Sequence, residues 1–229
     1  TCALPICKNL ISFFRNISVL SKLYCIFAEE FKKLKIKQIE RKMNTEILSA
    51  DKDPMGAAIL DFQQHGKAAR LRVLSSMFEE DEMPVKHLFR NLEEMPMLEQ
   101  KALSLAKGKV LDVGAGAGCH ALALQAQSIA VKAIDISPQS CQAMLQRGVK
   151  NVECINLFDP HLGSKSGMGS EDRLQNEDGS QSESGFDTIL LLMNGTGIAG
   201  KIENLPALFN RLKALLNKDG QILIDSSDI

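Results

Sequence analysis

The 229-residue chain has no tryptophan and only one tyrosine, Tyr24. A surface that stacks on nucleic acid bases would therefore depend on its ten phenylalanines. Charge points the same way, because residues 43–229 hold seven more acidic than basic side chains. A phosphate backbone repels such a surface. We therefore expect no nucleic acid partner.

The sequence also lacks the cysteine and histidine spacings that bind zinc. Its six cysteines, at positions 2, 7, 25, 119, 141 and 154, form no CxxC pair, and its four histidines form no HExxH motif. Nothing indicates a disulfide framework either. We expect no metal site, and we expect reduced thiols in a cytoplasmic protein.

A clean hydrophobic run is missing too. The apolar stretch 10–27 is interrupted by Arg15, Asn16 and Lys22, whereas a membrane span needs about 20 apolar residues. A membrane anchor and a secretory signal are the alternatives that we weighed. We expect residues 1–42, which carry a net charge of +6, to be a non-native or disordered basic extension, and we expect no membrane partner.

Residues 43–107 predict a helical N-terminal cap. Apolar residues recur at helical spacing over 56–64 and again over 67–78, with Gly66 between the two segments. Pro84 and Pro96 stand where short helices can begin, and the second of these helices is expected to end at Gly108.

Residues 108–229 predict an α/β domain. Strand patterns at 109–113, 129–135, 151–156, 186–194 and 221–225 alternate with helical patterns at 119–127, 137–148 and 205–220. Such alternation indicates a Rossmann-like three-layer sandwich, a mostly parallel sheet with helices on both faces. Residues 161–185 are rich in glycine, serine and acids, so we expect a disordered insertion there.

The stretch VLDVGAGAGCHALAL, residues 110–124, is typical of a nucleotide-binding turn. Gly114, Gly116 and Gly118 let the backbone turn sharply, and the helix that follows presents free N–H groups. The dinucleotide fingerprint GxGxxG would need a glycine where Cys119 stands. Asp112 would repel a diphosphate but attract an ammonium or sulfonium group. Asp135, at the end of the next strand, suits a ribose diol of either kind of ligand.

The blocks VLDVGAGAG, AIDIS, FDTILLLMNG and LLNKDGQILID, in this order, resemble the class I methyltransferases that use S-adenosyl-L-methionine. The resemblance covers about residues 105–229 and implies that cofactor. It also implies a seven-stranded sheet, two strands more than the chain contains. We therefore expect the last strands to be missing through a C-terminal truncation.

The resemblance also implies cofactor-binding residues. They are Asp112, Gly114, Ala115, Gly116 and Gly118 for the methionine part, Asp135 and Ile136 for ribose and adenine, Phe158 and Asp159 for adenine, and Met193 and Asn194 where methyl group and substrate meet.

Each of these residues has a structural alternative. The acids at 112, 135 and 159 could be structural, entering a helix or a turn, Phe158 could belong to the core, and Asn194 could form an ordinary turn. His120 could act as a base, but we expect an exposed histidine at a helix start.

The sequence thus predicts an S-adenosylmethionine-dependent methyltransferase with a small-molecule acceptor. Methyl transfer depends on alignment and needs a general base only for a protonated nucleophile, so the sequence identifies no catalytic residue. A non-catalytic cofactor-binding protein and a nicotinamide-dependent oxidoreductase are the alternatives.

Overall fold

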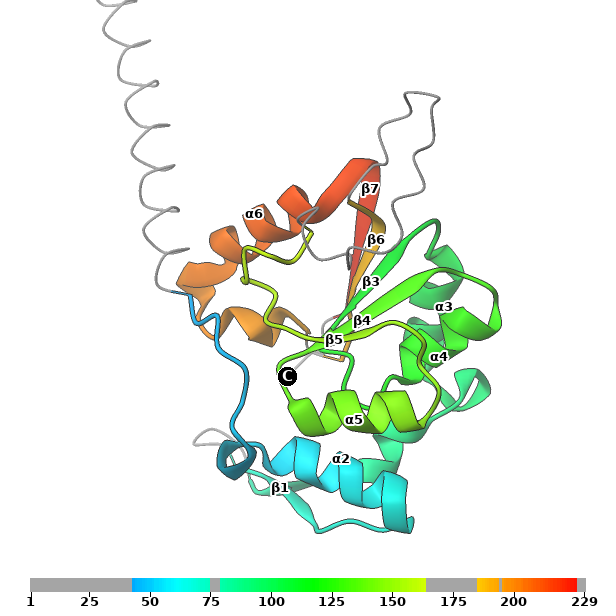
Figure 1. The fold of residues 1–229 in the computed structure, drawn as a ribbon, viewed down its shortest axis with the longest axis vertical. Coiled ribbons are helices and arrows are strands. Elements are labelled where there is room, and N and C mark those ends of the chain that lie inside the picture. Colours follow the sequence, from blue (N-terminus) through cyan, green and yellow to red (C-terminus); the bar gives the residue numbers. More distant parts are fainter. Residues whose placement is uncertain (1–42, 75–78, 164–184, 194, 226–229) are drawn as a thin grey trace, which may run out of the picture. The chain divides into compact units, whose positions relative to one another are not determined.

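A five-stranded parallel sheet forms the centre of residues 44–229, which make one compact unit (Figure 1). The computed structural model describes residues 43–74, 79–163, 185–193 and 195–225. The strand order is β5 (Val152–Cys154), β4 (Val131–Asp135), β3 (Val110–Val113), β6 (Phe186–Leu191) and β7 (Leu216–Ile224), with all neighbours parallel. The predicted α/β sheet is confirmed. Residues 1–42, and the expected insertion except for its edges, lie outside the described residues.

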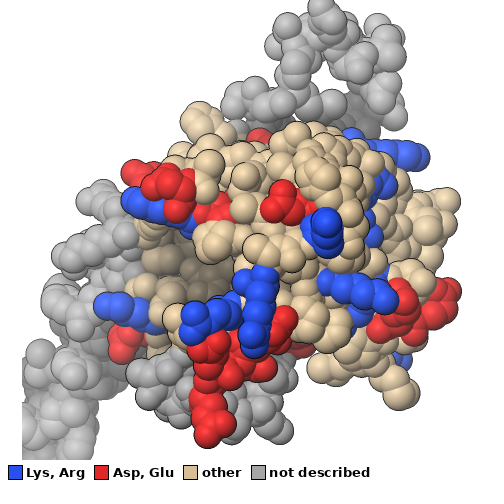
Figure 2. Space-filling view, turned by 90° about the horizontal axis from the view of Figure 1, so that it is seen from below, with Lys and Arg blue, Asp and Glu red and all other residues tan. Residues whose placement is uncertain are grey.

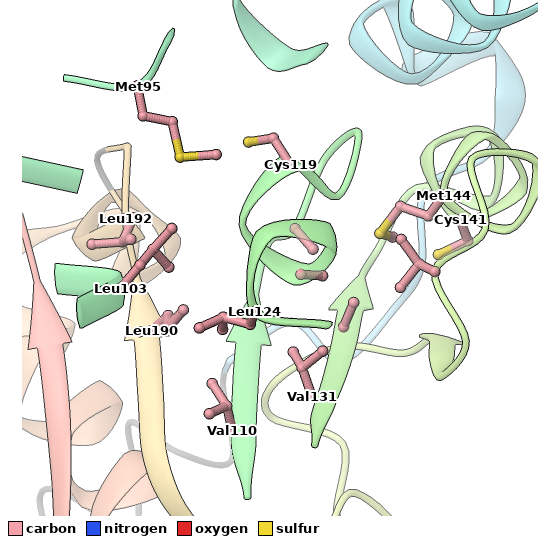
Figure 3. Close-up of a cluster of buried hydrophobic side chains, with 14 residues drawn as sticks. Met95, Leu103, Val110, Cys119, Leu124, Val131, Cys141, Met144, Leu190 and Leu192 are labelled. Carbon is pink, nitrogen blue, oxygen red and sulfur yellow. The ribbon is translucent and has the colours of Figure 1, made fainter. Parts of the chain in front are cut away.

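Helices cover both faces of the sheet because its strands are apolar on both sides. Helices α3 (Met97–Leu105), α4 (Cys119–Ala126) and α5 (Pro138–Gln146) pack on one face, and α6 (Leu205–Leu215) packs on the other. In β3, Val110 faces the first layer and Leu111 the second. Figure 3 shows the first layer, where side chains of β3, β4 and β6 meet those of α3 and α4. Complete burial of one such aliphatic side chain contributes about 2 kcal/mol.

Helix α5 begins as its sequence predicts. Ser137 is the N-cap, and its hydroxyl accepts a hydrogen bond from the N–H of Ser140 at 2.9 Å. Pro138 occupies the first turn, where a missing N–H costs nothing. The start of α5 is thereby fixed directly after β4.

The second predicted cap helix, over 67–78, is wrong. After α2 (Pro54–His65) the chain forms β1 (Leu71–Val73), which pairs antiparallel with β2 (Asp81–Met83). Ion pairs join Arg70 to Glu82 and Arg72 to Glu80 across the hairpin, while Leu71 turns toward the apolar cluster below α2. Arginine and apolar residues alternate with the period of a strand, and the acids opposite them stabilise that conformation.

Two predicted boundaries also shift. The helix after Pro96 ends at Leu105, three residues before Gly108. Strand β7 begins at Leu216 although the helical pattern continued to residue 220. A register shift between Phe186 and Thr188 places an irregularity in β7, where Asp219 has a φ of 63°. Leu216 pairs with Phe186 ahead of this irregularity, which extends the strand backward.

The cap consists of α2, the β1–β2 hairpin and the short helices η1 (Ala50–Lys52), η2 (Val85–Phe89) and η3 (Leu92–Glu94). Ile59 and Leu88 are buried in one apolar cluster with Ala117 and Ala143, which belong to the glycine turn and to α5. The short helices η5 (Gly195–Ala199) and η6 (Ile202–Asn204) connect β6 to α6. The cap therefore packs directly on the carboxyl-end side of the sheet.

Gly118→Ala tests how tightly this turn is packed. Gly118 has a φ of 79°, and a Cβ atom there would lie 2.9 Å from Met144 Cγ. Left-handed strain and overpacking together should lower the free energy of unfolding by about 3 kcal/mol. Urea denaturation measures this loss.

Gly66→Ala is the matched control. Gly66 has a similar φ of 69°, but no atom lies within 4 Å of its added Cβ. The control should lose only the backbone term, about 1 kcal/mol. Equal losses in the two variants would contradict the close packing at Gly118.

Candidate active site

The candidate site lies where the sheet reverses its winding direction. β3 is flanked by β4 on one side and β6 on the other. From β4 the chain continues outward to β5, and from β6 it continues outward to β7 at the opposite edge of the sheet. Ligands of open α/β sheets bind at the carboxyl ends of such strands. A cavity of about 900 Å³ lies at this point, between the sheet and the cap. Of the predicted residues it is lined by Asp112, Gly114, Ala115, Gly116, Asp135, Ile136 and Met193.

The glycine turn forms the floor of the cavity. Gly116 has a φ of 56°, and open space surrounds the position of an added Cβ, so a ligand can approach its backbone. The N–H groups of Gly114 and Ala115 donate to the carbonyl of Ile134, which fixes the turn to the end of β4. Gly118 does not line the cavity and instead packs against Met144 of α5 and Val149.

Asp135 ties the glycine turn to α5. Its Oδ2 accepts from the N–H of Gly116 at 2.8 Å, and its Oδ1 accepts from the N–H of Ser137 at 2.9 Å. Burial raises the pKa of Asp135, and the nearby charge of Asp53 adds to this, against the two hydrogen bonds. The hydroxyl of Ser137 in turn donates to the buried Asp53, the N-cap of α2. Asp135 is thus a helix-entry residue and also a cavity residue.

Asp112 lies in β3 with its side chain 2% exposed. Its Oδ2 has no hydrogen-bond partner among the described residues, although Asp112 lines the cavity. Burial raises the pKa of Asp112, the charge of His120 lowers it, and the charge of Asp135 raises it again. A buried carboxylate oxygen without a partner is costly, so the position suits a cationic ligand group.

His120 is buried, which makes the expectation of an exposed histidine wrong. Its Nε2 lies 3.0 Å from Oε2 of Glu99 in α3. Burial disfavours the charged imidazole, but hydrogen bonds with Cys119 and Glu99 and the charge of Asp112 outweigh it and raise the pKa of His120 to about 10. His120 therefore carries a positive charge at neutral pH.

Sequence reasoning missed Glu99, which pairs with His120, and Arg90, which pairs with Glu99. Both carboxylate oxygens of Glu99 accept from Nη2 of Arg90 at 2.9 Å, and the same Nη2 lies 3.5 Å from Sδ of Met193. Burial would raise the pKa of Glu99, but His120 and Arg90 outweigh it and lower that pKa. The signal available in the sequence was an acid four residues before the apolar Leu103, on the buried side of a helix.

Besides Gly118, the predicted residues Phe158 and Asp159 are not brought to the cavity. Phe158 packs beside the apolar layer under α6, and the Oδ1 of Asp159 accepts from the N–H of His161 at 2.8 Å. Neither lines the cavity, so their adenine contacts stay predictions. Asn194 lies outside the described residues.

The cap supplies the opposite wall. Apolar side chains line this side of the cavity: Leu48, Met55, Val73, Met83 and Leu88, joined by Leu98 of α3. The N–H of Leu48 donates to the carbonyl of Ile136 at 2.8 Å, which holds the first described residues across the carboxyl ends of the strands. The described residues include neither a cluster of side chains that could hold a metal ion nor a helix long and apolar enough to cross a membrane.

Comparisons with known proteins agree with this geometry. A family profile described as a methyltransferase domain matches residues 86–228. The chain is 53% identical to a SAM-dependent methyltransferase from Bacteroides fragilis, solved in complex with S-adenosyl-L-homocysteine. The match has a TM-score of 0.70 and covers 82% of this chain and 70% of the other.

The structure is also similar to the CcbJ methyltransferase from Streptomyces caelestis, at 13% identity and a TM-score of 0.45, over 75% of this chain and 56% of the other. A search of curated proteins finds no match. The family profile spans more than half of the chain, and the Bacteroides fragilis protein is more than 30% identical over most of it. The chain therefore belongs to the class I methyltransferase family and is an S-adenosyl-L-methionine-dependent methyltransferase.

Proposed function

We propose that this methyltransferase acts on a small-molecule acceptor that binds between the glycine turn and the cap. The cavity itself carries the proposal. Its volume of about 900 Å³ is at the upper end of the range for small-molecule sites, which gives room for a cofactor and a compact acceptor. We also propose a cytoplasmic location, because Cys119, Cys141 and Cys154 are free thiols.

The lining of the cavity supports an acceptor without negative charge. Among the described residues that line it there is no lysine or arginine, and the cap contributes apolar side chains. Figure 2 views the molecule from below and shows acidic and basic side chains interspersed on that face, without a continuous basic surface. Both observations argue against a nucleic acid or a phosphorylated acceptor.

We assign the cofactor to the residues of the sheet side. The free oxygen of Asp112 would bind the cofactor's ammonium group, and Asp135 would accept hydrogen bonds from the ribose hydroxyls. Ile136 and Leu48 offer apolar surface on either side of the same region for adenine. The turn at Gly114 and Gly116 allows close approach of the backbone. The proposal gives no role in this cavity to Phe158 or Asp159.

When bound, S-adenosyl-L-methionine supplies a methyl group on a positively charged sulfur. The residues of this chain contribute binding and orientation, which account for most of the acceleration in such a displacement. Met193 lies two residues after β6, at the edge of the cavity, with a φ of 57°, and its N–H donates to Oδ2 of Asp225 at 2.8 Å. This constrained corner would position the acceptor against the cofactor.

Asp135→Asn tests the assignment of the ribose site. The amide keeps one acceptor oxygen but loses the charge and the second acceptor, so affinity for S-adenosyl-L-homocysteine should fall about tenfold or more. Isothermal titration calorimetry measures the affinity. Asp61→Asn, which removes an exposed acid of α2 away from the cavity, should leave it unchanged. An unchanged affinity in Asp135→Asn would contradict the assignment of the ribose site.

Methyl label from S-adenosyl-L-methionine should appear in small molecules. The protein would be incubated with labelled cofactor and, separately, with small-molecule, nucleic acid and protein fractions of a cell extract. We expect label only in the first fraction, because a cavity of about 900 Å³ lined by apolar side chains of the cap suits a compact acceptor. Label in nucleic acid or protein would contradict the acceptor class. Cofactor binding without label in any fraction would favour a non-catalytic binding protein.

A further inference from the structure

A buried polar chain borders the cavity on the side of Asp112. Glu99 bonds to Arg90 on one side and to His120 on the other, and the side chains of these three residues are 15% exposed or less. They come from separate elements: the turn before η3, helix α3 and the first turn of α4. Removing three charges from water costs several kcal/mol for each ion before pairing. An apolar cluster at this place would avoid that cost, so the charged cluster calls for a functional explanation.

The cluster cannot serve as a general base. His120 already holds its proton at neutral pH, and both oxygens of Glu99 accept hydrogen bonds from Arg90. The guanidinium of Arg90 only donates hydrogen bonds. The role of the cluster is therefore electrostatic, and it acts on whichever charged group lies nearest.

Outside the cluster, Asp112 is the carboxyl group whose charge acts on His120, and both side chains line the cavity. The buried carboxyl of Asp112 needs help to stay ionised, because burial and the neighbouring Asp135 both favour the neutral form. The charge of His120 opposes them. Glu99 in turn fixes the imidazole and helps to keep it protonated.

The other charged and titratable groups around this end of the cavity do not supply positive charge. Cys119 precedes His120, Asp53 lies beyond Asp135, and Asp225 lines the cavity after β7. Arg90 lies behind Glu99 and is bonded to it. Among the described residues that line the cavity, His120 is the one positive side chain.

We propose that His120, held by Glu99 and Arg90, is a positioning residue that keeps Asp112 ionised so that its free oxygen can bind the ammonium group of the cofactor. The inference rests on the proposed cofactor assignment. It predicts that the cluster matters for ligands with the amino acid part and not for the nucleoside alone.

His120→Gln separates these two cases, because glutamine keeps an N–H donor for Glu99 but carries no charge. At a pH where Asp112 is ionised in the wild type but protonated in the variant, the variant should bind S-adenosyl-L-homocysteine more weakly, by up to about tenfold for each unit by which the pKa of Asp112 rises. Binding of 5′-methylthioadenosine, which lacks the amino acid part, should change less than twofold. Calorimetric titrations of the full chain measure both ligands.

The pH profile gives a second readout that a purely structural role would not move. Without the charge of His120, the pKa of Asp112 rises further, so protonation of Asp112 begins at a higher pH. When pH is lowered, the affinity of His120→Gln for S-adenosyl-L-homocysteine should therefore begin to fall at a higher pH than the affinity of the wild type. Glu99→Gln, which weakens the hold on the imidazole charge, should shift the profile in the same direction and replaces His120→Gln if that variant does not fold.

Asp112→Asn distinguishes failure of the inference from failure of the proposed function. If Asp112→Asn selectively loses S-adenosyl-L-homocysteine but His120→Gln and Glu99→Gln bind both ligands as the wild type does, the inference is overturned. Equal losses for both ligands in His120→Gln also overturn it. If Asp112→Asn binds both ligands normally, the ammonium site itself is wrongly assigned.

Discussion

The carboxylate of Asp135 is the contact on which the geometry of this site depends. One oxygen holds the N–H of Gly116 and the other holds the N–H of Ser137, so the glycine turn and the start of α5 share one acceptor. The hydroxyl of Ser137 donates a hydrogen bond to Asp53, the N-cap of α2, so α2 of the cap is bonded to the same segment. A single side chain at the end of β4 therefore sets the relative placement of three segments around the cavity.

Charge at this site is arranged for a cation. Burial removes the solvation of Asp112 and Asp135 and raises the pKa of both carboxyls, and the charge of Asp135 adds to the rise at Asp112. Such a pair is stable only where something positive is near, either the imidazolium of His120 or a bound ligand. A diphosphate would meet the same acids with repulsion, which is the physical reason why the turn suits a sulfonium cofactor better than a dinucleotide.

The sequence predicted the sheet well because its strands and helices differ in hydrophobic period. It failed over 67–78, where a helix was predicted but β1 forms, because ion pairs of Arg70 with Glu82 and of Arg72 with Glu80 stabilise the pairing of β1 with β2. The glycine turn and its acids could be read from the motif. The cluster of Arg90, Glu99 and His120 could not be read from the sequence, because these residues meet only through tertiary packing. The one indication was the acid Glu99 on the buried side of α3.

The contacts of the first described residues have a consequence for how the chain folds. The carbonyl of Glu46 accepts a hydrogen bond from the side chain of Asn156, 110 positions later. Asp53 accepts one from the hydroxyl of Ser137, 84 positions later. Glu46 and Asp53 are synthesised long before β4 and β5, and their partners follow those two strands. Closing such long loops lowers the entropy of the chain before the contacts can form and stabilise the closed loop. The cap is thus the earliest part of this unit to be synthesised and among the last to dock.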